Sequence, residues 1–325
     1  MTVKESIVSL LDSSKGTYIS GENIASRLSV TRSAVWKAIK ALQSEGYHIE
    51  AVTNKGYSLS PDTDILSVQS ILKYLDNSAK ALRIEVHKTV SSTNSIAREL
   101  AMAGEPEGRV VVSEEQTNGR GRRGRRFFSS AGAGIYMSLL LRPTFSAVDA
   151  ALLTAAAAVA VAVAIEQVSG RKTQIKWVND IYMDGKKVCG ILTEASSSLE
   201  NGGLEYAILG IGINSFEPQG GYPNDIADIA APVFNGESGT EDVRNRLAAA
   251  VLSSFMVYYG ELDSKAFLQE YKKRSLVIGK NITVINGTGS IPAQALDIDD
   301  VCHLKVRYED GREEYLSSGE ISIRV

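Results

Sequence analysis

The stretch that decides the fold reads Gln174-Ile-Lys-Trp-Val-Asn-Asp-Ile-Tyr-Met-Asp-Gly-Lys-Lys-Val-Cys-Gly-Ile-Leu-Thr-Glu194. Its two apolar runs, Gln174–Val178 and Val188–Glu194, predict strands, and Met183-Asp-Gly185 between them predicts a turn. Two strands joined by a short turn form an antiparallel hairpin, whereas a parallel pair needs a long crossover. The stretch therefore indicates an antiparallel arrangement at the centre of the chain.

The surrounding region, residues 65–274, mixes strands with helices. Further strands are predicted at Ile84–His87, Arg109–Ser113, Ile135–Leu141 and Tyr206–Ile213. Helices are predicted at Ile65–Leu75, Thr93–Ala103, Ala147–Val168, Thr240–Leu262 and Ser264–Arg274. Most neighbouring strands follow one another without an intervening helix, which favours an α+β fold over a doubly wound one. The prediction is a central mixed α/β domain with a largely antiparallel sheet.

The N-terminal region, residues 1–64, has the pattern of a winged helix-turn-helix. Ser20 begins a short helix, and Thr31 can cap a helix that runs to about Glu45. The buried stripe of that third helix leaves polar, basic and aromatic residues outside, namely Arg32, Ser33, Trp36, Lys37 and Lys40. A hairpin, or wing, follows at residues 48–59. This pattern is typical of DNA-binding domains.

Local charge separates DNA binding from the alternative, a small helical regulatory domain with a solvated surface. The whole chain has a net charge of -3, but residues 27–55 hold five Lys and Arg against two acids, a local +3. The excess lies on the side that should meet phosphates. The candidate DNA-binding residues are Thr31, Arg32, Ser33, Trp36, Lys37, Lys40 and Lys55.

The C-terminal region, residues 275–325, contains only strand and turn signals. Asn286-Gly, Asp299-Asp, Asp310-Gly and Ser318-Gly separate short runs rich in Val, Ile and Tyr. This spacing predicts a small β-barrel of about five strands.

The composition of the chain indicates the cellular compartment in which it works. The chain of 325 residues has two cysteines, Cys189 and Cys302, which are too few for a disulfide framework and fit a reducing environment. Its N-terminus lacks the apolar run of a secretory signal. The apolar run Ala150–Ile165 falls short of the roughly 20 residues that span a bilayer. We expect a cytoplasmic protein with no membrane partner, in which this run is a buried helix.

The densest chemical signal is Gly119-Arg-Gly-Arg-Arg-Gly124, followed by Arg125 and Arg126. It matches G-x-G-x-x-G, but a dinucleotide fingerprint must end a strand and open a helix, and this segment does neither. The Gly-Lys pairs at 185–186 and 279–280 lack the context of a P-loop. Glycine lets backbone N–H groups approach an anion, and arginine offers a planar charged fork, so the loop can close over an anionic ligand. An RNA-binding or disordered Arg-Gly tract is the alternative.

Charged residues of the central hairpin add to this signal. Strand alternation puts Lys187 and Gly190 on opposite faces of their strand. Lys187 should lie opposite Asn179 and Asp180, where it can place a cation beside a phosphate and a carboxylate beside Mg²⁺. A solvated hairpin tip is the alternative.

These motifs together resemble the biotin–protein ligase family (biotin–[acetyl-CoA-carboxylase] ligases), specifically its bifunctional members that also repress a biotin operon. The resemblance spans the chain in order and is carried by Ser92-Thr-Asn94, Gln116, Gly119–Gly124, Lys176-Trp-Val-Asn-Asp180, Lys187-Val-Cys-Gly190 and Gly210-Ile-Gly-Ile-Asn214. The family commonly has Pro where Val178 stands, and a Trp and a Ser-Pro where this chain has Phe127-Phe-Ser-Ser130.

The resemblance implies a winged helix-turn-helix, a catalytic domain and an SH3-like C-terminal barrel. It also implies a two-step reaction that uses ATP, biotin and Mg²⁺. The biotin carboxylate attacks the α-phosphate of ATP and forms biotinyl-5′-adenylate, which a lysine of the biotin carboxyl carrier protein then attacks. Operator DNA is the second partner, with biotinyl-5′-adenylate as corepressor. We expect a homodimer to form on adenylate binding, because a palindromic operator needs two helix-turn-helix units.

The resemblance also assigns the site residues. The catalytic residues are Lys187 and Arg120. The biotin-binding residues are Ser92, Thr93, Asn94, Gln116, Gly119, Arg120, Gly121, Arg122, Lys187 and Gly190. The adenylate- and ATP-binding residues are Arg122, Arg123, Phe127, Lys176, Asn179 and Asn214, and Asp180 is the candidate Mg²⁺ ligand.

Two other functions agree with the same residues. One is a repressor that senses biotinyl-adenylate or a similar effector and has lost transfer. The other is a lipoate–protein ligase, which has a similar catalytic core. The helix-turn-helix and the arginine-glycine loop favour biotin over lipoate.

Overall fold

A computed structural model describes residues 2–61, 63–144, 150–197, 203–234, 236, 242–286, 289–317 and 319–323. The chain divides into two compact units. The first contains Met1–Leu75 with Gly236–Ala249, and the second contains Asp76–Asn235 with Ala250–Val325. The predicted domain boundaries at 64/65 and 274/275 stay predictions.

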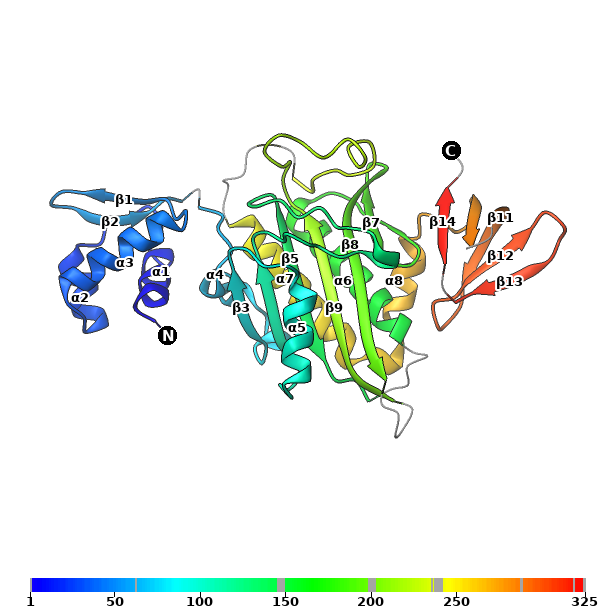
Figure 1. Ribbon diagram of the computed structural model, residues 1–325, viewed down its shortest axis with the longest axis horizontal. Coiled ribbons are helices and arrows are strands. Elements are labelled where there is room, and N and C mark those ends of the chain that lie inside the picture. The colour runs from blue at the N-terminus through cyan, green and yellow to red at the C-terminus, as the bar shows by residue number, and fades with distance from the viewer. Residues whose placement is uncertain are drawn as a thin grey trace. The chain divides into compact units, whose positions relative to one another are not determined.

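The first unit contains the predicted winged helix-turn-helix (Figure 1). Its elements are α1 (Val3–Asp12), α2 (Gly21–Leu28), α3 (Arg32–Ser44), β1 (Ile49–Val52) and β2 (Gly56–Leu59). The side chains of Ser20 and Thr31 accept backbone N–H bonds from Asn23 and Ala34, so both predicted caps are confirmed. Apolar residues of all three helices and both strands form one buried core.

The first unit also contains a buried polar network that ties the segment after the wing to the start of a distant helix. Asp64, predicted to lie in a linker, is 7% exposed and pairs with Arg244 at the start of α7 (Val243–Gly260). Arg244 Nε lies 2.9 Å from Asp64 Oδ2. Next to it, Lys15 Nζ lies 2.8 Å from Asp242 Oδ2. The linker residues are therefore built into the unit and are not a free tether.

The second unit is organised around a seven-stranded sheet with the order β3-β4-β5-β9-β8-β7-β6. The strands are β3 (Arg83–His87), β4 (Arg109–Ser113), β5 (Gly134–Leu141), β6 (Gln174–Lys176), β7 (Asp180–Met183), β8 (Lys186–Ser197) and β9 (Leu204–Asn214). Only β3 and β4 pair in parallel, and every other neighbouring pair is antiparallel. The predicted α+β class with a largely antiparallel sheet is confirmed.

The central hairpin differs from its prediction in two ways. The run Lys176–Asp180 does not lie in one strand. Lys176 ends β6, residues 177–179 form a turn that contains a cis Trp177–Val178 peptide, and Asp180 begins an additional strand, β7. In β8, Val188 is an extra residue, because Ile181 pairs with Cys189 and Tyr182 pairs with Lys187. A β-bulge of this kind reverses the alternation, so Lys187 and Gly190 lie on the same face and the predicted opposite placement is wrong.

Helices cover both faces of this sheet (Figure 1). Helix α5 (Thr93–Met102) packs on β4, β5 and β9, whereas α6 (Ala150–Ser169) packs on β6, β7 and β8 from the other side, next to α8 (Phe267–Lys273). Residues 147–149 and 240–241 of the predicted helices lie outside the described residues. The second unit also contains a short 3₁₀ helix, Asn77–Ala79, whereas α4 (Val68–Tyr74) belongs to the first unit.

Helix α6 is long and apolar enough to cross a membrane, with a mean hydropathy of 2.0 over its apolar window. It has 20 residues, so it is longer than the apolar run suggested. Its window is 72% buried inside the structure, and Ala155–Ala162 is completely buried. The predicted buried helix is confirmed, and its burial, not its length, shows that it is a core helix.

The C-terminal residues form a five-stranded antiparallel sheet with the order β13-β12-β11-β10-β14. Its strands are β10 (Asn281–Asn286), β11 (Gly289–Ile298), β12 (Leu304–Tyr308), β13 (Glu313–Leu316) and β14 (Glu320–Ile323). The predicted number of strands is confirmed. Of the predicted turn residues, Gly287 and Ser318 lie outside the described residues.

Candidate functional site

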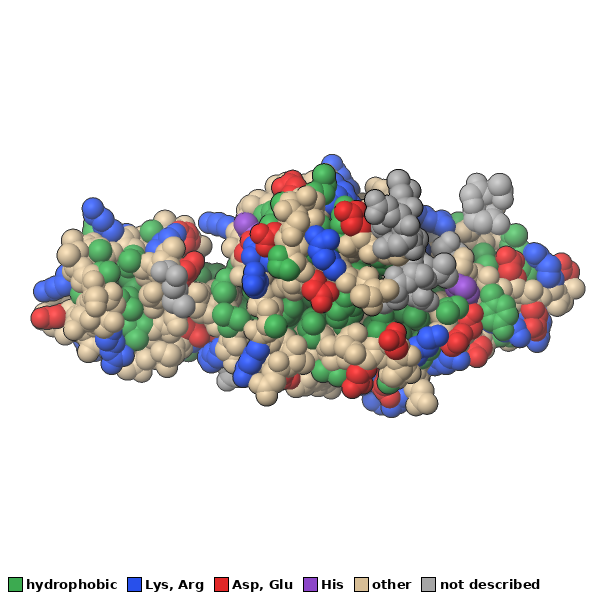
Figure 2. Space-filling view, turned by 90° about the horizontal axis from the view of Figure 1, so that it is seen from below, with side chains coloured by type: hydrophobic (Ala, Val, Ile, Leu, Met, Phe, Trp, Pro, Cys, Tyr) green, Lys and Arg blue, Asp and Glu red, His purple; other side chains and the backbone are tan. Residues whose placement is uncertain are grey.

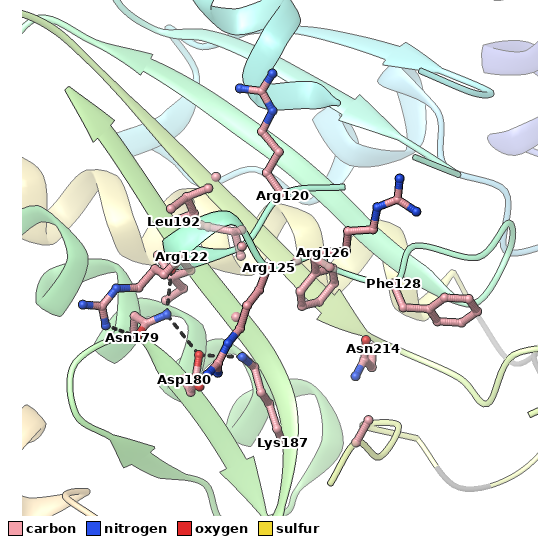
Figure 3. Close-up of a pocket in the computed structure, with 18 of the residues that line it drawn as sticks. Arg120, Arg122, Arg125, Arg126, Phe128, Asn179, Asp180, Lys187, Leu192 and Asn214 are labelled. Carbon is pink, nitrogen blue, oxygen red and sulfur yellow. Dashed lines mark hydrogen bonds and ion pairs between the residues drawn. The ribbon is translucent and has the colours of Figure 1, made fainter. Parts of the chain in front are cut away.

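A pocket of about 360 Å³ opens on the α5 side of the central sheet. The N-terminus of α5, the arginine-glycine loop, strands β8 and β9, residues Tyr222–Ala230 and strand β14 all contribute to its walls. This volume is within the range of small-molecule sites. Figure 3 shows Asn179, Asp180 and Lys187 turned toward one another at one end, with Arg125 reaching toward them.

One end of the pocket is neutral and polar. Ser92, Thr93 and Asn94 begin α5 and are almost completely buried. Gln116 Oε1 accepts a 2.9 Å hydrogen bond from the Thr93 N–H, and Gln116 Nε2 donates to Ser129 Oγ at 3.0 Å. These groups offer donors and acceptors without net charge, which suits a neutral ligand ring with both kinds of group.

Glycines open the sheet between the two ends of the pocket. A Cβ at Gly210 would overlap the Asn94 amide, and a Cβ at Gly212 would come within 2.5 Å of the Phe127 ring. Gly190 is the β8 partner of Gly212, and the Phe127 ring and the Lys187 ammonium occupy the space above it. Phe127 therefore lies between the polar end and the end that contains Lys187.

The other end of the pocket is positively charged, because several cationic side chains lie there. Arg122 Nη1 donates to Asn179 Oδ1 at 2.9 Å, and Asn179 Nδ2 donates to Asp180 Oδ1 at 3.0 Å. Lys187 Nζ lies 2.7 Å from the same carboxylate (Figure 3). Lys187 pairs with Asp180, Arg122 is linked to the same carboxylate through Asn179, and Arg125 extends toward this end (Figure 3), so three cations accompany one acid and leave a positive excess that suits an anion.

Contacts from two other segments hold Lys187 and Arg122 at this cationic end. The Lys187 N–H donates to Ile229 O at 2.7 Å, and the Ala231 N–H donates to Lys187 O at 3.0 Å. The pocket wall at Tyr222–Ala230 is therefore bonded directly to the backbone of Lys187. The carbonyl oxygen of Gly319, the residue before β14, accepts a 3.3 Å hydrogen bond from Arg122 Nη2.

Burial also determines which groups near the pocket can ionise. Burial raises the pKa of the Cys189 thiol far above its usual value, so this cysteine is a packing residue rather than a nucleophile. Burial, helped by Asp180, raises the pKa of Tyr182 to about 12. Burial and then Glu217 raise the pKa of Tyr222, whose hydroxyl has no hydrogen-bond partner among the described residues.

Nearly all the predicted ligand-binding residues line this one pocket. They are Ser92, Thr93, Asn94, Gln116, Arg120, Gly121, Arg122, Arg123, Phe127, Lys176, Asn179, Asp180, Lys187, Gly190 and Asn214. Gly119 is the exception. It is buried behind the lining, where a Cβ would meet the Phe127 carbonyl and Ser129. Arg120 lies 3.8 Å from Glu194 and points away from Lys187 (Figure 3).

Several lining residues were not predicted. They are Arg125, Arg126, Phe128, Trp177, Tyr182, Ile191, Leu192, Gly210, Ile211, Gly212, Tyr222, Ile226, Ile229, Ala230, Gly319 and Ile321. Gly210 and Gly212 belong to a motif that was recognised, and their period of two on one strand was the signal that could have identified them. No local pattern marks residues 222–230 or Gly319.

The candidate metal ligand is a single carboxylate. Among the described residues, no group of three or more His, Cys, Asp and Glu side chains could hold a metal ion. Asp180 alone fits the way Mg²⁺ usually binds beside a nucleotide, through one or two carboxylates together with phosphates of the substrate.

The predicted DNA-binding residues, Thr31 included, are all exposed on the surface of the first unit. Arg32, Ser33, Trp36, Lys37 and Lys40 are exposed along one side of α3, while Val35, Ile39 and Leu42 are buried on the other. In the wing, Lys55 is exposed and its Nζ lies 5.6 Å from the centroid of the Tyr18 ring. In the second unit, acidic and basic side chains are instead interspersed on the face drawn in Figure 2.

Three family models match the chain in this same order. A model described as an HTH domain matches residues 3–58. The model of the Biotin/lipoate A/B protein ligase family matches residues 86–214, which contain most of the pocket. A model described as the Biotin protein ligase C terminal domain matches residues 277–324.

Curated and solved relatives agree with these models. The chain is 35% identical over 320 residues to the bifunctional ligase/repressor BirA of Bacillus subtilis (strain 168), with 98% of each chain covered. It is 29% identical to BirA of Escherichia coli (strain K12), covering 99% of this chain and 98% of that one. The biotin protein ligase from Aquifex aeolicus in complex with biotin and ATP superposes with a TM-score of 0.60 at 26% identity, over 74% of this chain and 98% of that chain. This chain therefore belongs to the biotin protein ligase family, among its bifunctional ligase/repressor members.

Proposed function

We propose that this protein is an ATP-dependent biotin–protein ligase that also represses transcription. In the first step the biotin carboxylate attacks the α-phosphate of ATP, and pyrophosphate leaves as biotinyl-5′-adenylate forms. In the second step a lysine amine of an acceptor protein attacks the mixed anhydride, and AMP leaves. The acceptor we propose is a biotin carboxyl carrier protein.

One observation carries this proposal, namely the order of chemistry along the pocket floor. The neutral polar groups around Thr93 lie at one end, Phe127 lies over the glycines in the middle, and Lys187 lies at the other end. Biotin presents groups in the same order, with a neutral ureido ring, an apolar chain and a carboxylate. The nucleotide phosphates then belong at the cationic end.

The cationic residues supply the electrostatic part of the first step. Bringing a carboxylate to a triphosphate requires positive charge, which Lys187, Arg122 and Arg125 are placed to provide. Asp180 is the carboxylate available for a Mg²⁺ ion that arrives with ATP, and such an ion neutralises phosphate charge. For Arg120, an equivalent catalytic role stays a prediction, because its guanidinium lies beside Glu194.

Biotin-dependent exchange of label between pyrophosphate and ATP tests the ligase directly. We expect exchange with biotin and none with lipoate, because the polar end around Thr93 and Gln116 matches a ureido ring. Transfer of biotin to a carrier domain should follow. Exchange without transfer indicates the repressor that only senses its effector, and exchange that lipoate supports indicates the lipoate ligase.

The first unit supplies the DNA-binding half of the proposal, and a prediction follows for α3. Replacing Lys37 with alanine should make the slope of log K against log salt concentration less negative by about 1 on a mixed-sequence DNA duplex, because one phosphate contact is lost. Fluorescence anisotropy over a salt series measures this slope. Lys80→Ala removes an equally exposed charge from the second unit and should leave the slope unchanged. Equal slopes for Lys37→Ala and the parent would contradict the assigned surface.

We extend the proposal to the control of DNA binding by the adenylate. Adenylate binding fixes the loop Gly119–Arg126 over the ligand, and two chains then associate so that two helix-turn-helix units meet one palindromic operator. Ordering a loop residue costs about 1–2 kcal/mol, so ligand and dimer contacts support each other. Sedimentation velocity should show a monomer with biotin alone and a dimer with biotin and ATP. A monomer under both conditions would contradict this.

A further inference from the structure

The turn at residues 177–179 connects β6 to β7 and brings polar groups to the cationic end of the pocket. Asn179 Oδ1 accepts a 2.9 Å hydrogen bond from Arg122 Nη1. Asp180, the next residue, holds Lys187 Nζ at 2.7 Å (Figure 3). The positions of both cationic side chains therefore depend on the path that this turn follows.

A buried tyrosine outside the pocket holds the middle of the turn. The hydroxyl of Tyr271, in α8, donates a 3.0 Å hydrogen bond to the carbonyl oxygen of Val178. Tyr271 is completely buried and is not among the described residues that line the pocket. Burial raises its pKa well above the usual value, so the hydroxyl keeps its proton and remains a donor at neutral pH. Tyr271 can therefore act on a ligand only through the residues that it holds.

Helix α8 is itself fixed to the strand from which the turn starts. The Ile175 N–H, in β6, donates to Arg274 O at 2.7 Å, and the Leu276 N–H donates to Ile175 O at 2.8 Å. The helix also packs on α6. Tyr271 precedes Arg274 by three residues, which is less than one helical turn. Its hydroxyl is therefore held at a defined place relative to β6.

The first residue of the turn is bonded to a different element. Trp177 is 4% exposed, and its Nε1 donates a 2.9 Å hydrogen bond to the Cys302 carbonyl. Cys302 lies in the connection between β11 and β12, which is closed by a 3.2 Å bond from the Cys302 N–H to Asp299 O. Two consecutive residues of the turn are thus held by α8 and by the C-terminal sheet.

We infer that Tyr271 is a positioning residue for the nucleotide. By holding the Val178 carbonyl, it fixes the turn that keeps Arg122 and Lys187 directed at the phosphates of a nucleoside triphosphate. Trp177 supports the same turn through its own bond. The inference rests on the proposed ligase function and adds to it a residue that contacts neither substrate.

The test is Tyr271→Phe in the full-length protein, which removes one oxygen atom and leaves the aromatic ring in the core. In biotin-dependent pyrophosphate exchange, KM for ATP should rise about tenfold, the effect of one lost hydrogen bond to a buried carbonyl. KM for biotin should stay within about threefold of the parent, because its ring binds at the other end of the pocket. A hydroxyl that only stabilises the fold would leave both KM values unchanged.

Tyr258→Phe is the matched control. The Tyr258 ring packs edge to face on Phe267 of the same helix, with centroids 6.4 Å apart, and its hydroxyl makes no hydrogen bond within the described part of the chain. Both KM values of this variant should equal those of the parent. If Tyr271→Phe and Tyr258→Phe have the same KM for ATP, the inference is wrong. Exchange that is absent from the parent would instead refute the proposed function.

A double-mutant cycle identifies the route by which Tyr271 acts. Asn179→Ala removes the side chain that follows Val178 and bonds Arg122. In this background, Tyr271→Phe should raise KM for ATP by less than about threefold, because the link that the turn positions is already lost. A full tenfold increase there would show that Tyr271 acts by another route and would overturn the inference.

A second variant keeps the inference testable if Tyr271→Phe fails to fold. Trp177→Phe keeps an aromatic ring in the pocket wall and removes the donor to the Cys302 carbonyl. We expect KM for ATP to rise about tenfold here as well, with KM for biotin again within about threefold of the parent. An unchanged KM for ATP in Trp177→Phe would then overturn the inference.

Discussion

Replacing Lys187 with alanine is expected to slow biotin adenylation by about 10²–10³-fold, the effect of losing one preorganised charged donor. The bulge at Val188 turns Lys187 into the pocket, where its ammonium lies above Gly190 beside the Phe127 ring. Asp180 holds the ammonium at 2.7 Å, and two backbone bonds to residues 229–231 fix the strand that carries it. Because the Lys187 ammonium is already held in place, little of the site must rearrange when negative charge develops on the α-phosphate.

The chain supplies a matched control for this prediction in the preceding residue. Lys186 is exposed, and its Nζ contacts Ala227 O at 3.3 Å outside the pocket lining. Lys186→Ala removes the same charge from the same strand and should retain exchange within about threefold of the parent. Initial rates of biotin-dependent pyrophosphate exchange, at saturating biotin and ATP, measure both variants. A Lys187→Ala enzyme with undiminished exchange would refute the catalytic role.

The second large effect is expected for Arg244→Met, which should destabilise the first unit by about 3–5 kcal/mol, because it leaves Asp64 as a buried charge without its partner. Both side chains are 5% exposed. The Arg244 backbone N–H and Nε donate to the two carboxylate oxygens of Asp64, and Nη2 donates to the Asp64 carbonyl. Hydrogen exchange of the α1–α3 amides in the full-length protein measures this loss as protection reduced by about 10²–10⁴-fold.

The loss should depend on pH in a defined direction. Burial raises the pKa of the Asp64 carboxyl, and Arg244 opposes that shift. A raised pKa means that the folded state binds the proton more tightly than the unfolded state does, so this group favours folding less as pH rises above about 4. Without Arg244 the pKa rises further. The deficit of Arg244→Met should therefore be small at acidic pH, grow as pH rises from the pKa of Asp64 in the folded parent to its higher pKa in the folded variant, and stay constant above that.

A paired substitution identifies the cause of the instability. Asp64→Asn combined with Arg244→Met removes both charges, and this double variant should recover most of the protection that Arg244→Met loses. If the double variant is as unstable as Arg244→Met, lost packing and not the isolated charge is responsible. Arg244→Met with protection equal to the parent would show that the pair contributes nothing.

Local sequence signals were sufficient to predict the secondary structure of the first unit and of most of the central sheet. Ser20 and Thr31 cap helices through bonds to residues three positions later, so a single stretch of chain contains the whole cause. The buried stripe of α3 and its exposed basic side follow from the helical period in the same way. The strands of the central sheet were recognised because apolar runs and turn residues are also local features.

The prediction of which β8 side chains share a face was wrong, because one extra residue changes the register of β8 against β7. Nothing local in Lys186–Leu192 shows that Val188 is a bulge, because the bulge exists only relative to the pairing with β7. Strict alternation therefore put Lys187 and Gly190 on opposite faces. The resemblance placed both residues at the ligand, and the bulge is the structural reason that both line one pocket.

The sequence alone determined the order of the three regions, the helix caps, the basic side of α3 and the residue types that surround the ligand, because each depends on neighbours within a few positions. Tertiary structure alone decided which of these residues meet. Asn94 reaches Glu194 across 100 positions, and Asp64 reaches Arg244 across 180. Such contacts depend on strand register and on the packing of whole elements. Burial then strengthens their charge interactions and hydrogen bonds, because water no longer screens or competes for them.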